Sequence, residues 1–93
     1  MAKRIDTIEI QTNDQLIEVR WKTSQQLRGR LLGAGFHSTE KKFADKGTSA
    51  PIELELAEKE QLLGAVRACI KTLGDEKARE LLPLRNALKA DLS

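Results

Sequence analysis

The chain has 93 residues, with 16 Lys and Arg against 14 Asp and Glu, one His and one Cys. This length suits a single domain over residues 1–93, and one Cys excludes an intrachain disulfide framework and a Cys-based zinc cluster. Leu, Ile, Val and Phe account for 24 of the 93 residues, above the roughly 20% below which disorder is expected. We therefore expect a folded core, with no cofactor and no metal.

The chain contains no apolar run long enough to cross a membrane. Its basic start, Met1-Ala2-Lys3-Arg4, is not followed by the apolar segment that a secretion signal requires. We expect a cytoplasmic protein without a membrane partner.

The N-terminal quarter predicts an antiparallel β-hairpin. Residues 4–11 place Ile8 and Ile10 on one face of a strand, and residues 16–22 alternate apolar and charged side chains. Residues 12–15 include Asn and Asp, which tolerate the backbone of a tight turn. The alternation places Ile17, Val19 and Trp21 on the buried face.

The next segment predicts a short helix and a second hairpin. Thr23-Ser24 offers an N-cap for a helix over residues 25–34, and Gly35 is a plausible terminator. Leu27 and Leu31 stand four residues apart on one face of this helix. Residues 36–46 read as two short strands with a turn near residues 39–41, and residues 47–51 read as a loop.

The C-terminal half predicts one more strand followed by amphipathic helices. Residues 52–56 alternate Ile and Leu with Glu, as in a strand, and the apolar spacing from residue 57 to residue 73 is helical, with Gly74 at the end. Asp75 can cap a final helix, and Pro83 suits the first turn of a new segment because proline lacks a backbone N–H. The tail is therefore either one kinked helix or two short ones.

These elements predict the α+β fold class. We expect a small, largely antiparallel sheet, made of the N-terminal hairpin and further strands, with a short helix between them. The amphipathic C-terminal helices should cover this sheet.

Few residues could support catalysis. His37 is the only His, and a general acid or base needs a matched partner that the chain does not supply nearby. Cys69 lies within an amphipathic helix and is expected to behave as a small apolar residue. The four glutamates between residues 53 and 60 are more typical of a solvated edge than of a catalytic pair. We expect no enzyme, and a His37-dependent nuclease is the alternative.

The strongest candidate for binding is a basic segment over residues 20–46, which carries seven cations against two carboxylates. All three aromatic residues, Trp21, Phe36 and Phe43, fall within it. Cations hold phosphates and aromatic rings stack on unpaired bases, but the parity of Trp21 indicates that at least two of these rings belong to the core. The cations that we expect to bind nucleic acid are Arg20, Lys22, Arg28, Arg30, Lys41, Lys42 and Lys46.

The sequence therefore predicts a small non-enzymatic binding protein that recognises nucleic acid through this segment. The alternative is a regulator or inhibitor that binds a protein target, such as one encoded by a mobile genetic element. Convergence of the seven cations on one face would favour nucleic acid, and their dispersal would favour the protein target. Homodimerisation is compatible with both functions, because a chain of this length has a marginal core.

Overall fold

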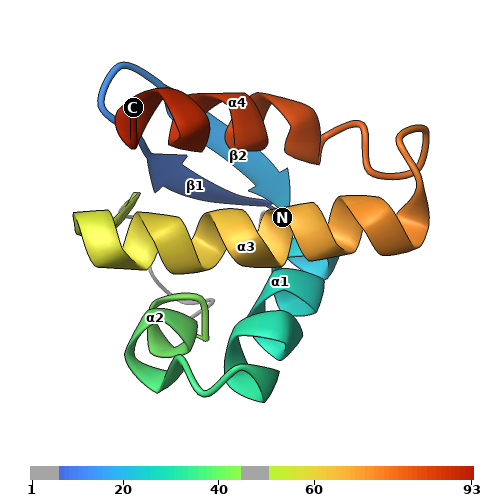
Figure 1. Cartoon of the computed structure of the whole chain (residues 1–93), viewed down its shortest axis with the longest axis horizontal. Helices are drawn as coiled ribbons and strands as arrows, with labels where there is room; N and C mark the ends of the chain where they lie inside the picture. Colours follow the sequence, from blue (N-terminus) through green and yellow to red (C-terminus); the bar gives the residue numbers. More distant parts are fainter. Residues whose placement is uncertain (1–6, 45–50) are drawn as a thin grey trace, which may run out of the picture.

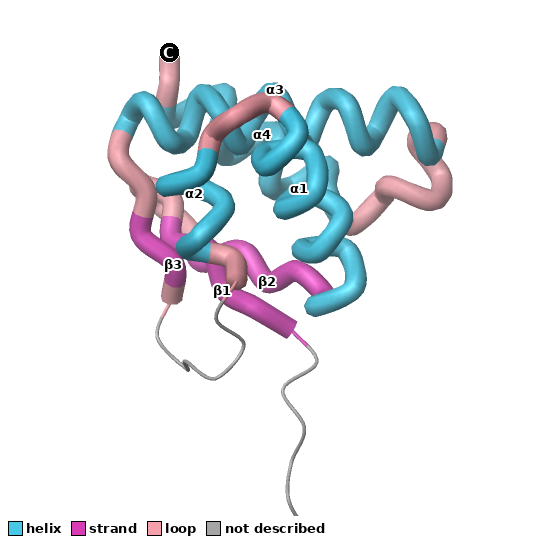
Figure 2. Tube along the Cα trace, turned by 90° about the horizontal axis from the view of Figure 1, so that it is seen from below, coloured by secondary structure: helices cyan, strands magenta, loops and turns pink. Residues whose placement is uncertain are grey.

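The computed structural model describes residues 7–44 and 51–93. These residues form three strands and four helices. The fold class is α+β, as the sequence predicts. Figure 1 shows α3 and α4 side by side in front of the strands, and Figure 2 shows the helices together above the sheet. The elements are β1 (Thr7–Gln11), β2 (Leu16–Arg20), α1 (Trp21–Gly33), α2 (His37–Lys42), β3 (Ile52–Glu53), α3 (Leu56–Leu73) and α4 (Leu81–Asp91).

The N-terminal hairpin is confirmed. β1 and β2 pair antiparallel, with Ile8 opposite Val19 and Ile10 opposite Ile17, so the apolar residues share the face that the helices cover. The turn is closed by the Thr12 hydroxyl, which donates to the Gln15 carbonyl oxygen (2.9 Å). Residues 4–6 of the predicted first strand lie outside the described residues.

The sheet is mixed, which corrects the expectation of a largely antiparallel one. Its order is β2-β1-β3, and β3 pairs with β1 in parallel through Ile10 opposite Ile52. The predicted strand over residues 52–56 is also too long, because β3 ends at Glu53. Glu55 instead caps α3, where its backbone N–H donates to Glu58 Oε1 (2.9 Å).

The start of α1 differs from the prediction. The helix begins at Trp21, so Thr23 and Ser24 lie inside its first turn and are buried, and they do not cap it. The end is as expected: Gly35 has a positive φ of 86°, a conformation that glycine adopts without strain. The Phe36 N–H donates to Leu31 O (2.9 Å) and the Gly35 N–H to Leu32 O (3.0 Å), which is a Schellman motif.

The second predicted hairpin is wrong, since residues 37–42 form the helix α2. Thr39, Glu40 and Phe43 are buried, and together with Phe36 they have helical rather than alternating spacing. Polar partners make this burial possible. The Thr39 hydroxyl bonds Gln61 of α3, and Glu40 pairs with Arg28 of α1. Residues 45 and 46 lie outside the described part of the chain.

The C-terminal helices form as the 3-4 spacing predicts. α3 ends at Leu73, and Gly74 follows with a φ of 86°. Residues 75–80 form turns, so Asp75 does not begin a helix, and α4 starts at Leu81 with Pro83 in its first turn. Both helices contribute to the same core cluster as Val19 and Leu27.

A buried ion pair joins the two C-terminal helices to the hairpin turn. Lys59 Nζ of α3 lies 2.9 Å from Asp91 Oδ2 of α4, and both side chains are less than a tenth exposed. Asn13 completes the cluster, because its Oδ1 accepts from Lys59 and its N–H donates to Asp91. This contact ties the end of α4 to α3 and to the turn between β1 and β2.

Candidate nucleic-acid interface

Three cations of the basic segment are paired with nearby carboxylates. Arg20 contacts Glu80 (3.0 Å) and Lys42 contacts Glu58 (2.7 Å). The third, Arg28, pairs with the buried Glu40. Each of these carboxylates cancels much of the field that its cation would present to a phosphate.

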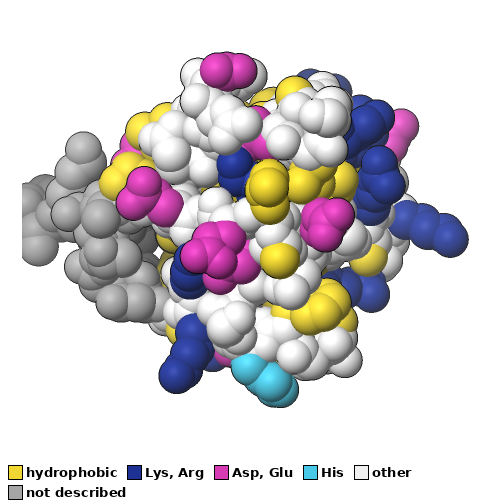
Figure 3. All heavy atoms as spheres, turned by 60° about the vertical axis from the view of Figure 1, so that its left-hand side comes forward, with side chains coloured by type: hydrophobic (Ala, Val, Ile, Leu, Met, Phe, Trp, Pro, Cys, Tyr) yellow, Lys and Arg dark blue, Asp and Glu magenta, His cyan; other side chains and the backbone are white. Residues whose placement is uncertain are grey.

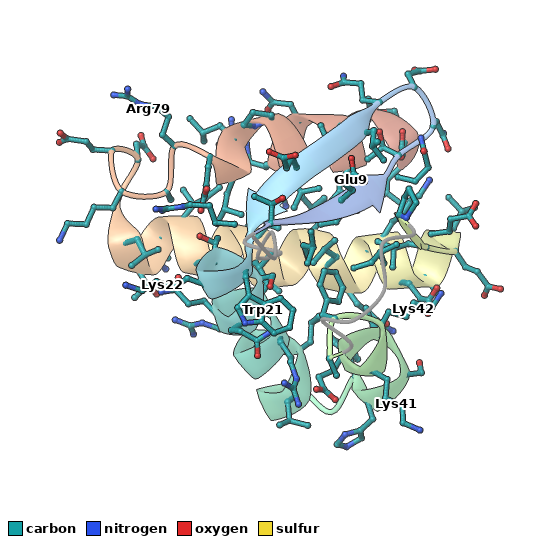
Figure 4. All side chains as sticks on the ribbon, turned by 180° about the vertical axis from the view of Figure 1, so that it is seen from behind. Glu9, Trp21, Lys22, Lys41, Lys42 and Arg79 are labelled. Carbon is teal, nitrogen blue, oxygen red and sulfur yellow. The ribbon has the colours of Figure 1, made fainter. Side chains whose placement is uncertain are left out.

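The remaining cations of the segment do not share a surface. Arg30 donates to the Thr72 hydroxyl of α3 (2.8 Å). Figure 4 shows Lys22 at the start of α1, on the opposite side of the molecule from Lys41 and Lys42 of α2. Lys46 lies outside the described residues. Arg20 and Lys22 line one hollow together with Lys77, but the other described cations of residues 20–46 do not line it, so the segment does not form one binding face.

The aromatic rings of the segment have different environments. Phe43 is buried in the core, whereas Phe36 is 37% exposed. Trp21 begins α1 and is half-buried, so its predicted place in a strand core is wrong. The alternation of β2 ends at Arg20, where the chain turns into the helix.

A different set of cations does converge. α3 and α4 contribute two cations each to a hollow of about 310 Å³, and Ile70 forms part of its lining. Among the described residues, no salt bridge involves any of the four. Figure 3 shows Lys and Arg side chains gathered at the upper right, on the side where the α3–α4 surface of Figure 1 lies. We call this hollow the basic cleft, and its cations are Arg67, Lys71, Arg85 and Lys89.

The helical repeat explains why these four side chains meet. Arg67 and Lys71 stand four residues apart on α3, and Arg85 and Lys89 stand four residues apart on α4. Residues with this spacing lie on the same face of a helix. The packing of Ile70 and Leu84 into the common core brings the two faces together.

The basic cleft is not apparent from the sequence, because residues 51–93 have a net charge of −1. The eight carboxylates of residues 51–93 offset the cations in the net charge of this half. Several of these carboxylates pair with cations outside the basic cleft. Glu58 and Glu80 pair with Lys42 and Arg20, and Asp91 pairs with Lys59. The paired i, i+4 cations were the signal that could have revealed the site.

The residues that could support catalysis are not assembled into a site. His37 is exposed at the start of α2, so the strand environment predicted for it is wrong. Cys69 is buried, and burial raises the pKa of its thiol even though the Arg30 guanidinium lowers it. Among residues 7–44 and 51–93, no group of His, Cys, Asp and Glu side chains could hold a metal ion. No helix in these ranges is long and apolar enough to cross a membrane.

A second hollow, of about 620 Å³, lies between α1 and α3. It is lined by the end of α1, by Phe36 and by small residues of α3. We call it the apolar groove, and its lining residues are Arg30, Leu31, Ala34, Phe36, Ala57, Glu60, Gln61, Gly64, Ala65 and Ala68. The basic cleft and the apolar groove share no residue.

Comparison with known proteins adds no family to this description. No protein-family model, no curated protein and no solved structure matches the chain significantly.

Proposed function

We propose that the protein binds the phosphate backbone of nucleic acid at the basic cleft. One observation carries the proposal: two helices direct four cations to one hollow, and no salt bridge among the described residues neutralises them. Phosphates attract such a cluster strongly, because each contact releases condensed counterions into solution.

The chemistry of the cleft favours binding that does not depend on sequence. Lys and Arg contacts with phosphates position a protein on nucleic acid without reading the bases. The exposed ring of Phe36 lines the apolar groove instead of the cleft, so stacking on unpaired bases does not contribute there. The dispersal of the cations of residues 20–46 favours a protein target for that segment, so the nucleic-acid proposal rests on the cations of α3 and α4 instead.

Charge neutralisation tests this proposal. We expect the double variant Lys71→Gln/Lys89→Gln to bind generic oligonucleotides about tenfold more weakly at low salt, because two phosphate contacts are lost. Both lysines are exposed, so the fold should be unaffected. Fluorescence anisotropy with labelled single-stranded and duplex oligonucleotides measures the affinity.

Lys22→Gln/Lys41→Gln is the matched control, because it removes two equally exposed lysines that lie outside the cleft. We expect it to keep most of the wild-type affinity. Equal losses in the two double variants would show that only net charge matters. Absence of binding to either form of oligonucleotide at low salt would remove the proposal and favour a protein target.

A further inference from the structure

The floor of the apolar groove includes a glycine, Gly64, at a position where the fold has room for a side chain. Gly64 stands in the middle of α3 and is exposed, and a Cβ added there would meet nothing within 4 Å. Glycine inside a helix is less favourable than alanine, and Gly64 differs from the equally open Gly29 in that it lines the apolar groove. A bare helix surface lets the backbone or side chain of another molecule approach closely.

The same surface also carries protruding apolar side chains. Of the four large apolar residues that are exposed in the described part of the chain, Phe36 lines the groove, and Leu32 and Leu56 are the chain neighbours of the lining residues Leu31 and Ala57. Figure 3 shows the single His at the lower edge of the view, with exposed apolar side chains above it. The surface therefore combines a hollow at Gly64 with exposed apolar side chains that could fill the same hollow on another copy of the chain.

Opposite charges stand on the two walls of the groove. Arg30 is on the α1 wall and Glu60 is on the α3 wall. Within residues 7–44 and 51–93, no salt bridge involves either side chain. Arg30 donates to the Thr72 hydroxyl, and its guanidinium has further N–H donors for a carboxylate. In a two-fold dimer a contact from one residue to another occurs twice. Arg30 of each copy can therefore meet Glu60 of the other.

We propose that the occupant of the apolar groove is a second copy of this chain, packed about a two-fold axis. Phe36 of each copy packs over the small residues of α3 in the other, and two Arg30–Glu60 pairs flank the apolar contact. The basic cleft shares no lining residue with the apolar groove. This inference does not depend on nucleic-acid binding.

Charge reversal gives the most selective test. Analytical ultracentrifugation of the wild-type protein, at concentrations up to about 1 mM, should show an equilibrium between monomer and dimer. The single variants Arg30→Glu and Glu60→Arg should each weaken self-association tenfold or more, because like charges then face each other twice. An equimolar mixture of the two variants should dimerise again, since one copy then carries two acidic groups where the other carries two basic ones.

A glycine comparison tests the groove separately from its charges. Gly64→Gln should abolish the dimer by filling the hollow, whereas Gly29→Gln should not. Gly29 is a matched control because it also stands inside a helix, is exposed and has open space around it, but does not line the groove. Circular dichroism verifies that each variant is folded.

Either of two results would overturn the proposal. One is a wild-type protein that is monomeric at every concentration. The other is a dimer that persists in Glu60→Arg and Gly64→Gln and is not restored by mixing the charge variants, which would place the dimer interface elsewhere.

Discussion

The Lys59–Asp91 pair is the most deeply buried pair of charges among the described residues. Its role is to anchor α4, because Asp91 lies at the end of that helix and also accepts from the Asn13 N–H in the hairpin turn. A buried ion left without its partner is strongly destabilising. We therefore expect Lys59→Met to lower the free energy of unfolding by about 3–5 kcal/mol, as measured by urea denaturation.

The double variant Lys59→Met/Asp91→Leu separates the pair from its surroundings. It should be more stable than Lys59→Met, because it leaves no unpaired charge in the interior. Asn13 then lacks both partners, so the recovery should be incomplete. A single variant within about 0.5 kcal/mol of wild type would indicate a solvated pair with little effect on stability.

The start of α3 depends on Glu58. Burial by itself raises the pKa of this carboxyl group, but the Glu55 N–H and the Lys42 ammonium outweigh it and lower the pKa below the usual value. A carboxyl group whose pKa is lowered by folding stabilises the protein above its unfolded pKa of about 4.3. That contribution is lost as the pH falls through the folded pKa.

We expect Glu58→Gln to lower the free energy of unfolding at pH 7 by about 0.5–2 kcal/mol, in the range of a lost helix cap. The difference from wild type should shrink as the pH falls below about 4. Denaturant titrations between pH 3 and pH 7 measure both effects. Glu53→Gln, at an exposed position of β3, is the control. A difference for Glu58→Gln that is independent of pH would contradict the ionic role.

The elements that the sequence predicts correctly are those whose apolar residues show their own periodicity. Ile17 and Val19 alternate with charged residues in β2, and α3 repeats apolar residues every three or four positions. Local spacing is enough in such segments, because the buried face consists of apolar side chains. The Schellman motif is equally local, since it depends on Gly35 directly after the helix.

The errors occur where distant partners decide the structure. Thr39 and Glu40 are polar, so the sequence of α2 shows no apolar helical periodicity. Their burial depends on hydrogen bonds with Gln61 and Arg28. β3 is short because Glu55 and Glu58 start α3 early, and its parallel pairing with β1 joins residues that are far apart in the chain. Neither partner can be read from the segments themselves.

At the scale of the whole molecule, the fold decides which cations lie together without a paired carboxylate, and the local charge of the sequence does not. The basic segment carries the highest local density of cations, yet the carboxylates of Glu40, Glu58 and Glu80 neutralise part of it. The cations that remain unpaired and adjacent come from the half of the chain with a net negative charge. The position of the basic cleft could not be predicted from the sequence, because it depends on the packing of α3 against α4.

The salt dependence of oligonucleotide binding tests the central claim most directly. If the four cations of the basic cleft each neutralise one phosphate, the logarithm of the affinity should fall against the logarithm of the salt concentration with a slope of about −3.6 on duplex and about −2.8 on single strands. Arg67→Gln/Arg85→Gln should reduce the slope on duplex by about 1.8. A slope near zero, or one that this double variant leaves unchanged, would contradict phosphate binding at the cleft.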